Sequence, residues 1–375
     1  MWDQLPELIL TQIFDYLDRT DRASVSQVCQ SWNRTLSSPV LWRSVTVLID
    51  RDLRGDFPLA GELAAKYGQH MRSLELAFSR PYISPRQIRI RRNIQAEAGA
   101  DFLAIVRAKD VQLRQLTLTN WVFGYKWGNR GILLSALANF LRYLRLLGRF
   151  HALTLLKLDY PALSNHALDA LASGASKTLK YLYISVRDSD SRQHMVADAA
   201  WRNLVLACPD LTVSYTIVNI SHYEDMCYLL LPSVPLAKFH MFSGHVWDQS
   251  RSRNFRNTIG LIITQYTNTL VEVMLQLRNN RESLDDLLVS MLIRCKRLTR
   301  LQYDGIIRSL ETLREICQLQ AERKTHFRTI HVKPRNVNIQ NRAILNDINY
   351  RYDRKMHEQG VDFRIEDITS ILFFY

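Results

Sequence analysis

The sequence predicts an α/β protein in which three N-terminal helices are followed by one curved solenoid of alternating strands and helices with a parallel sheet. Three observations lead to this prediction. The first segment, about 45 residues long, places apolar side chains at helical spacing. A strand-like leucine pattern then recurs nine times, at intervals of about 25 to 42 residues. The segments between its copies carry helical apolar stripes, and repeated strand–helix units align their strands in parallel.

The N-terminal helices begin with residues 5–17, where apolar side chains recur every three or four positions. Pro6 fits the first helical turn, where its missing N–H costs nothing. We expect Asp21 to cap a second helix, and Leu41 and Trp42 to lie in a final short turn. Because so few residues cannot bury all these side chains by themselves, the helices should either pack on the rest of the chain or dock a partner.

These residues also form an ordered motif: Leu5-Pro6-Glu7-x-x-Leu10-x-x-Ile13-Phe14-x-x-Leu17, then Val28-Cys29-x-x-Trp32, then Leu41-Trp42. The motif resembles the F-box, which we place at residues 1–46. The resemblance implies three helices that bind the Skp-family adaptor of cullin–RING (SCF) ubiquitin ligases and, through it, the cullin and RING subunits. The positions it assigns to adaptor binding are Leu5, Pro6, Leu8, Ile9, Ile13, Phe14, Leu17, Val28 and Trp32. The alternative for some of them, Trp32 in particular, is a place in the interior.

Residues 47–375 contain the nine copies of the pattern L-x-x-L-x-L, with other apolar residues substituting for leucine. The copies are Met71–Leu76, Leu113–Leu118, Leu153–Leu158, Leu179–Ile184, Leu211–Tyr215, Leu236–Met241, Leu270–Leu275, Leu298–Tyr303 and Phe327–Val332. The clearest helical stripes between them lie at residues 130–147, 283–294 and 309–323. We expect each copy to form a strand and each stripe to form a helix that covers one face of the sheet.

This order of elements resembles the leucine-rich-repeat class of F-box proteins. That family places Asn or Cys three residues after the last leucine of a repeat, where the side chain binds the loop backbone. Here the position is occupied by Trp121, Pro161, Arg187, Gly244, Arg278, Ile306 and Arg335. We therefore expect no asparagine ladder and irregular repeats, and a generic α/β domain remains the alternative fold.

The chain is basic, with 49 Lys and Arg against 36 Asp and Glu and a net charge of +13. Arginines gather in three segments that follow predicted strands; they are Arg86, Arg89, Arg91, Arg92, Arg251, Arg253 and Arg278. Guanidinium groups bind carboxylates or phosphates with two parallel hydrogen bonds. We predict an acidic or phosphorylated protein segment as the partner of these arginines. Solvated loops and nucleic-acid binding are the alternatives.

Two further groups of residues are candidates for target binding. The outward positions of the predicted strands include Tyr181, Tyr183, His240 and His331. The segment with Trp121, Tyr125 and Trp127 is unusually aromatic, and exposed aromatics beside arginines are typical of binding hot spots. The alternative is that these aromatics cover the core. The apolar residues Ile371–Tyr375 are expected to form a last strand or a cap.

Catalytic and metal-binding motifs are missing from the sequence. It has no G-x-S-x-G, H-E-x-x-H, P-loop or G-x-G-x-x-G segment. Asp285 and Asp286 are interpreted as helix-cap charges. The five cysteines are scattered, which is typical of reduced thiols in the cytoplasm or nucleus. We expect neither a signal peptide nor a membrane span, and neither a cofactor nor a metal.

Together these observations predict a non-catalytic subunit that recruits a target protein to an SCF ubiquitin ligase. The N-terminal helices would bind the adaptor and the repeats would bind the target. A non-degradative F-box scaffold is the first alternative. A nucleic-acid-binding protein that uses the arginine-rich segments is the second, although no recognition motif supports it.

Overall fold

The computed structural model describes residues 5–48, 59–77, 102, 113–118, 152–160, 163–174, 178–188, 195–220, 222–243, 254–335 and 337–366. The chain divides into two compact units. The first consists of residues Met1–Lys157 and His166–Leu179, and the second of Leu158–Asn165 and Lys180–Tyr375. Strand β4 (Leu155–Asp159) and helix α8 (Asn165–Gly174) contain residues of both units.

The first unit begins with the predicted helices, which are α1 (Glu7–Asp15), α2 (Arg19–Val25), α3 (Gln30–Leu36) and the 3₁₀ helix η2 (Pro39–Trp42). Pro6 is the N-cap residue of α1, one position before the first turn in which the sequence placed it. The cap of α2 is Asp18, whose carboxylate accepts the N–H of Asp21 at 2.8 Å, so the expectation that Asp21 is the cap is wrong. The helices enclose a small core, which consists of Leu10, Phe14, Leu36 and Leu41.

These helices pack directly on the first strand–helix repeat of the same unit. That repeat comprises β1 (Ser44–Leu48), α5 (Leu59–Tyr67), the 3₁₀ helix η3 (Gly68–His70) and β2 (Ser73–Ala77), and β3 (Gln115–Leu118) follows. The ring of Trp42 stacks on that of Tyr67 with centroids 4.7 Å apart and planes 10° apart. Trp42 Nε1 also donates to the carbonyl of Leu36 at 2.7 Å. The helices therefore cover the end of the first repeat, which would otherwise expose its apolar side.

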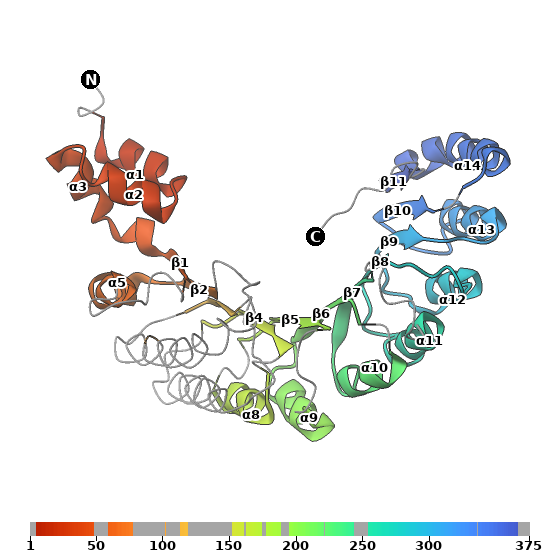
Figure 1. Ribbon diagram of the computed structural model, residues 1–375, viewed down its shortest axis with the longest axis horizontal. Coiled ribbons are helices and arrows are strands. Elements are labelled where there is room, and N and C mark those ends of the chain that lie inside the picture. The colour runs from red at the N-terminus through yellow and green to blue at the C-terminus, as the bar shows by residue number, and fades with distance from the viewer. Residues whose placement is uncertain are drawn as a thin grey trace, which may run out of the picture. The chain divides into compact units, whose positions relative to one another are not determined.

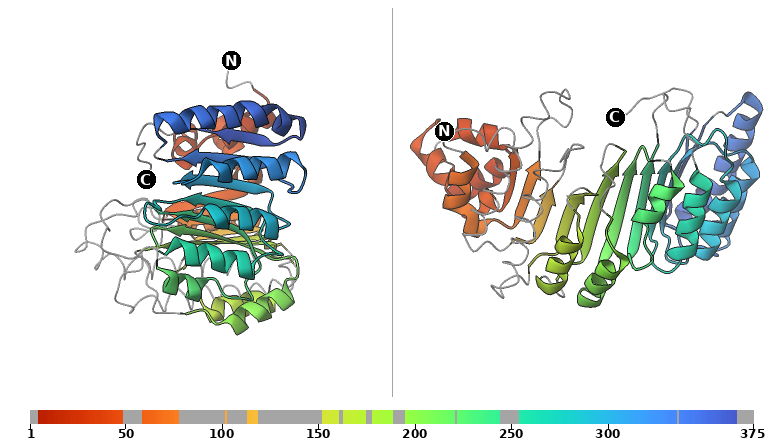
Figure 2. Two further views of the ribbon diagram at one scale, coloured as in Figure 1. Left: turned by 90° about the vertical axis from the view of Figure 1, so that its right-hand side faces the viewer. Right: turned by 60° about the horizontal axis from the view of Figure 1, so that its bottom comes forward.

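The second unit is a series of strand–helix repeats. Its strands are β5 (Tyr181–Arg187), β6 (Thr212–Val218), β7 (Leu236–Phe242), β8 (Glu272–Gln276), β9 (Arg300–Gly305), β10 (Thr329–Pro334) and β11 (Asp362–Ile365). Its helices are α9 (Asp198–Ala207), α10 (Tyr223–Leu229), α11 (Phe255–Gln265), α12 (Asp285–Arg294), α13 (Leu310–Ala321) and α14 (Ile339–Glu358). In this unit these helices lie on one side of the sheet (Figures 1 and 2).

The parallel sheet predicted from the sequence is confirmed in both units. Strands β1 to β3 pair in parallel in chain order, and so do β5 to β11. Each of the nine leucine-pattern copies contains a strand, and the stripes at residues 283–294 and 309–323 are helices α12 and α13. The sequence missed β1 and β11. The predicted helix at residues 130–147 lies outside the described residues.

One repeat has a loop-binding asparagine that the repeat pattern did not predict, although a single asparagine forms no ladder. Asn279, which is buried, lies just after β8 and one position later than Arg278, where the family pattern would place it. Its Oδ1 accepts the N–H of Ile306 at 2.8 Å, and its Nδ2 donates to the carbonyls of Ile306 at 3.0 Å and of Glu282 at 3.1 Å. A side chain at Gly305 would lie 2.9 Å from the same Oδ1, so glycine is required there. Asn279 thus joins two successive repeats.

The interpretation of Asp285 and Asp286 as cap charges agrees with the structure. Asp285, in the first turn of α12, accepts the backbone N–H of Ser309 at 2.8 Å, where α13 begins. Asp286 accepts a hydrogen bond from Arg256 Nη1 at 2.7 Å. These carboxylates hold adjacent repeats together.

Replacing Asn279 with alanine should lower the free energy of unfolding by about 2–3 kcal/mol, because the N–H of Ile306 would lose its acceptor and the carbonyl of Ile306 would keep only the hydroxyl of Tyr303 as a side-chain donor. Urea unfolding followed by far-UV circular dichroism measures this change. Asn280→Ala is the matched control, since Asn280 is exposed and its bond to Arg308 uses only the main-chain carbonyl. Identical unfolding curves for the two variants would contradict the assigned role of Asn279.

Candidate functional site

One side of helix α1 exposes a row of apolar side chains. Leu8 is 69% exposed, Ile9 and Ile13 are each 40% exposed, and Tyr16 is 93% exposed. The spacing of Ile9, Ile13 and Tyr16 places these three on the same side, because residues three or four apart are neighbours on a helix surface, and Leu8 is exposed about 100° round the helix from Ile9. Pro6 is exposed just before the helix begins. The core of this small unit is filled by other residues, so the row is available to a partner.

The other sequence-predicted adaptor residues lie at different depths. Phe14 is only 2% exposed and belongs to the core, where the ring of Trp32 meets it edge-on with centroids 5.5 Å apart. Leu5, Leu17 and Trp32 are partly buried against that core. Val28 is exposed in the turn between α2 and α3. Phe14 therefore supports the exposed row from beneath rather than forming part of it.

Sequence reasoning missed Tyr16 and Arg22 in this region. Tyr16 stands three residues after Ile13, so helical spacing alone could have placed it beside the apolar row. Arg22 lies in a segment where only the apolar residues were used to predict a helix. Its role depends on contacts between elements, which residue spacing does not reveal.

Arg22 holds the N-terminal helices together through the carbonyl groups at their ends. Its Nε donates to the carbonyl of Phe14 at 3.1 Å, and its Nη1 donates to the carbonyl of Leu41. Its guanidinium also lies 5.9 Å from the centre of the Trp42 ring. The carbonyl of Phe14 also accepts the N–H of Leu17 at 3.2 Å, so this arginine adds a side-chain hydrogen bond to the end of α1. Burial lowers the pKa of Arg22, while the charge of Asp15 opposes that shift.

Residues 2–47 match the model of the F-box-like family. The N-terminal domain is therefore an F-box-like domain. Among curated proteins, the bovine F-box/LRR-repeat protein 21 is 22% identical over 370 residues, which cover 87% of this chain and 82% of that protein. The mouse F-box/LRR-repeat protein 12 is 42% identical over 45 residues, 12% of this chain and 14% of that protein. Over most of its length the chain is thus distantly homologous to F-box/LRR-repeat proteins.

The second candidate surface is the face of the second unit's sheet that the helices leave uncovered. Tyr181 is exposed and Tyr183 is half-buried, both on β5. His240 lies on β7 and His331 on β10. Three strand spacings separate β7 from β10, which amounts to about 14 Å. These candidates therefore share one face but do not converge on a single point. Arg278, the remaining described candidate, lies just after β8 and is half-buried.

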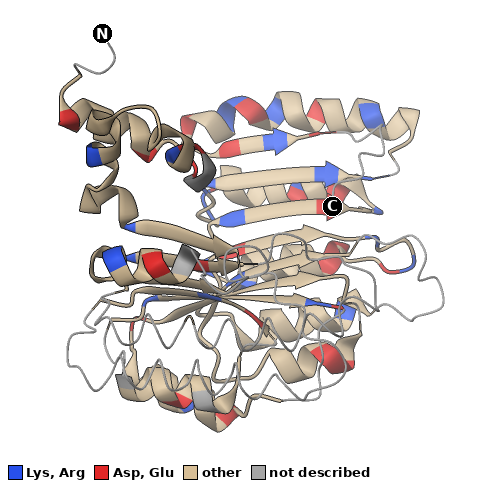
Figure 3. Ribbon diagram, turned by 60° about the vertical axis from the view of Figure 1, so that its left-hand side comes forward, with Lys and Arg blue, Asp and Glu red and all other residues tan. Residues whose placement is uncertain are grey.

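Figure 3 marks acidic and basic positions on the strands. Several charged residues on this face are paired with one another. Glu272 Oε1 lies 2.9 Å from His240 Nε2, and Oε2 lies 3.1 Å from Lys238 Nζ and 3.8 Å from Arg300 Nη1. The hydrogen bond from His240, followed by that from Lys238, lowers the pKa of Glu272 to about 2, although burial opposes the shift. His331 Nε2 lies 2.8 Å from Asp362 Oδ2. Ion pairs and hydrogen bonds between neighbouring strands thus hold these charged side chains on the face.

Several predicted candidates lie outside the described residues. They are Arg86, Arg89, Arg91, Arg92, Trp121, Tyr125, Trp127, Arg251, Arg253 and the C-terminal residues Ile371–Tyr375.

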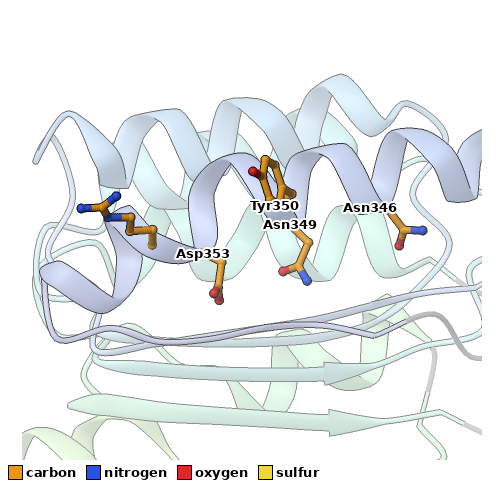
Figure 4. Close-up of a pocket in the computed structure, with 5 residues that line it drawn as sticks. Asn346, Asn349, Tyr350 and Asp353 are labelled. Carbon is orange, nitrogen blue, oxygen red and sulfur yellow. The ribbon is translucent and has the colours of Figure 1, made fainter.

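The described part of the chain contains no candidate membrane span and no candidate metal centre. No helix there has both the length and the apolar content that crossing a membrane requires. No group of three or more potential ligands among His, Cys, Asp and Glu is suitably placed for a metal ion. A hollow on α14 is lined by Asn346, Asn349, Tyr350, Asp353 and Arg354 (Figure 4). All five side chains come from one helix, so the hollow is a surface feature.

Glu272→Gln should destabilise the protein most at neutral pH. Because the pKa of Glu272 in the folded state, about 2, lies below the ordinary carboxylate value, its ionised form stabilises the fold above that ordinary value. This stabilisation should disappear as the pH falls from about 4.5 towards about 2. Urea unfolding of the wild type and the variant at several pH values measures the difference.

The control for this series is Glu315→Gln, which changes an exposed glutamate on α13. Its difference from the wild type should stay small and should not depend on pH. A difference for Glu272→Gln that is equally flat across the acid range would contradict the role of the carboxylate.

Proposed function

We propose that this protein is the target-recognition subunit of an SCF-type cullin–RING ubiquitin ligase. The F-box-like domain binds a Skp-family adaptor and, through it, the cullin and RING subunits. The repeats hold the target protein. The chain itself performs no chemistry, and a separate enzyme of the complex transfers ubiquitin.

The observation that carries the proposal is the exposed apolar row of Leu8, Ile9, Ile13 and Tyr16 on an F-box-like domain. An amphipathic helix that buries one side in its own core and exposes a second apolar side is suited to docking against a partner. The row lies on a domain with its own filled core, so binding need not unfold it. The homology to F-box/LRR-repeat proteins over most of the chain supports the same proposal.

The geometry of the repeats supports a role in target binding. A parallel sheet with one uncovered face offers a broad polar surface that can hold a protein target by many separate contacts. Tethering raises the effective concentration of the target near the transferring enzyme and fixes its orientation. The rate gain therefore comes from proximity, which requires no catalytic residue in this chain.

Leu8→Asp should weaken binding of the Skp-family adaptor by roughly 30-fold, because it places a charge in an apolar contact that excludes water. Isothermal titration of purified adaptor into the full chain measures the effect. Leu206→Asp is the matched control, since Leu206 is a 76% exposed leucine at the end of helix α9. Pro6→Ala should also weaken adaptor binding. Thermal unfolding followed by circular dichroism should be unchanged for all three variants.

Leu10→Ala provides the opposite comparison, because Leu10 is in the core and its loss should lower the unfolding temperature. Equal adaptor affinity for Leu8→Asp and the wild type would refute the proposed surface. Degradation is tested separately, by measuring the half-life of a captured target with and without cullin activity. A half-life that does not depend on the cullin would indicate the non-degradative scaffold instead.

A further inference from the structure

Three arginines of the first unit stand immediately before consecutive strands. Arg43 precedes β1, Arg72 precedes Ser73 at the start of β2, and Arg114 precedes Gln115 at the start of β3. Arg43 and Arg114 are exposed and Arg72 is half-buried. Basic residues recur at strand ends in Figure 3. We call these three residues the arginine row.

The backbone holds the row in register. The carbonyl of Arg43 accepts the N–H of Arg72 at 2.8 Å, and the carbonyl of Arg72 accepts that of Arg114 at 2.7 Å. Ser44 pairs with Ser73, and Ser73 with Gln115, so the preceding arginines occupy equivalent positions. Neighbouring members are therefore one strand spacing apart, about 4.8 Å. Three like charges at this spacing repel one another unless an anion lies among them.

No carboxylate within the described residues neutralises the arginine row. Arg72 Nη1 donates to the carbonyls of Gln69 at 3.1 Å and Met71 at 2.9 Å, and none of the three forms an ion pair there. In the second unit, by contrast, basic residues of the sheet pair with carboxylates. For example, Lys238 Nζ lies 3.1 Å from Glu272 Oε2. Within the described residues, the arginine row thus lacks the carboxylate partners that Lys238 has.

The neighbouring positions on the same strands carry no charge. They are Ser44, Ser73 and Gln115, and the hydroxyl of Ser73 donates to Gln115 Oε1 at 3.5 Å. The nearest carboxylate on β2 is Glu75, three residues from Arg72 and therefore about 10 Å along the strand. Glu75 accepts a hydrogen bond from Thr46 at 3.1 Å.

We propose that the arginine row binds an extended acidic segment of the recruited target protein. This inference rests on the proposed function and names the chemistry of the target that the repeats hold. In an extended chain, side chains two positions apart lie on the same side about 6.6 Å apart, and those four positions apart lie about 13 Å apart. The row spans two strand spacings, about 9.6 Å. A segment with carboxylates at alternate positions can therefore place two or three of them along the arginine row.

An acidic protein segment fits the row better than a nucleic acid does. Proteins that bind single strands stack the bases on exposed aromatic rings. The aromatic rings described near the row, Trp42 and Tyr67, already stack on each other. A long polyanion would also require an extended tract of free basic groups, whereas three arginines match a short segment.

The test uses the full chain and a fluorescein-labelled peptide of ten residues with glutamate at every second position, measured by fluorescence anisotropy. The wild type should bind this peptide and should not bind its glutamine analogue. Arg43→Gln combined with Arg114→Gln should weaken binding by about tenfold, since both charges are exposed. Arg72 is left intact because its hydrogen bonds support the local backbone.

Arg297→Gln combined with Arg328→Gln is the matched control and should leave peptide affinity unchanged. Arg328 precedes β10 just as the row precedes its strands, but its register neighbours are Thr299 and Val361. If the double variant fails to fold, the single variants Arg43→Gln and Arg114→Gln test the inference instead. Each should weaken peptide binding by about threefold.

Equal affinity of the wild type and the Arg43 and Arg114 variants for the glutamate peptide would overturn the inference. So would equal binding of the glutamine analogue, or tighter binding of a fifteen-nucleotide oligothymidylate through the same arginines. Adaptor binding is measured on the same preparations. Absence of adaptor binding would contradict the proposed function. Adaptor binding without peptide binding would contradict only this inference.

Discussion

The register between neighbouring strands depends on one recurring main-chain contact. In the first unit the carbonyl of Arg43 accepts the N–H groups of both Arg72 and Ser73, each at 2.8 Å. In the second unit the carbonyl of Val271 accepts the N–H of Thr299 at 2.9 Å in the same way. Because side chains alternate between the two faces of a strand, this contact determines which residues lie under the helices and which face outward. A slip of one residue would turn every buried leucine outward.

The same constraint explains how the charges of the protein are used. Carboxylates that lie at the starts of repeats serve the fold: Asp285 holds the beginning of α13, and Asp198 accepts the N–H of Ser233 at 2.9 Å. Glu272 is similarly occupied by its neighbours on the open face. These carboxylates are committed to contacts inside the second unit, whereas no described carboxylate pairs with the arginine row of the first unit.

The strands were predictable because the leucine pattern is a local property of the sequence. Strands β1 and β11 escaped because neither carries the full leucine pattern, and only pairing with a neighbour identifies them as strands. The role of Asn279 was not predicted because the residue stands one position away from where the family pattern places it. Its role also depends on Ile306 of the next repeat. The candidate surfaces were predictable as sets of outward residues. The pairing of His240 with Glu272 was not, because it depends on the register between two strands.

The hardest distinction for the sequence lies on α1, where Ile13 and Phe14 are adjacent apolar residues with different roles. A helix with apolar residues on two sides can turn either side inward, and its own sequence does not decide which. The decision comes from outside the helix: Trp32 meets the ring of Phe14, and Arg22 binds the carbonyl of Phe14. Once Phe14 is fixed inward, helical geometry forces Ile13 outward. The exposed row and the core beneath it thus both follow from the way Phe14 packs. A change at Phe14 would disturb the exposed row, although Phe14 is not part of it.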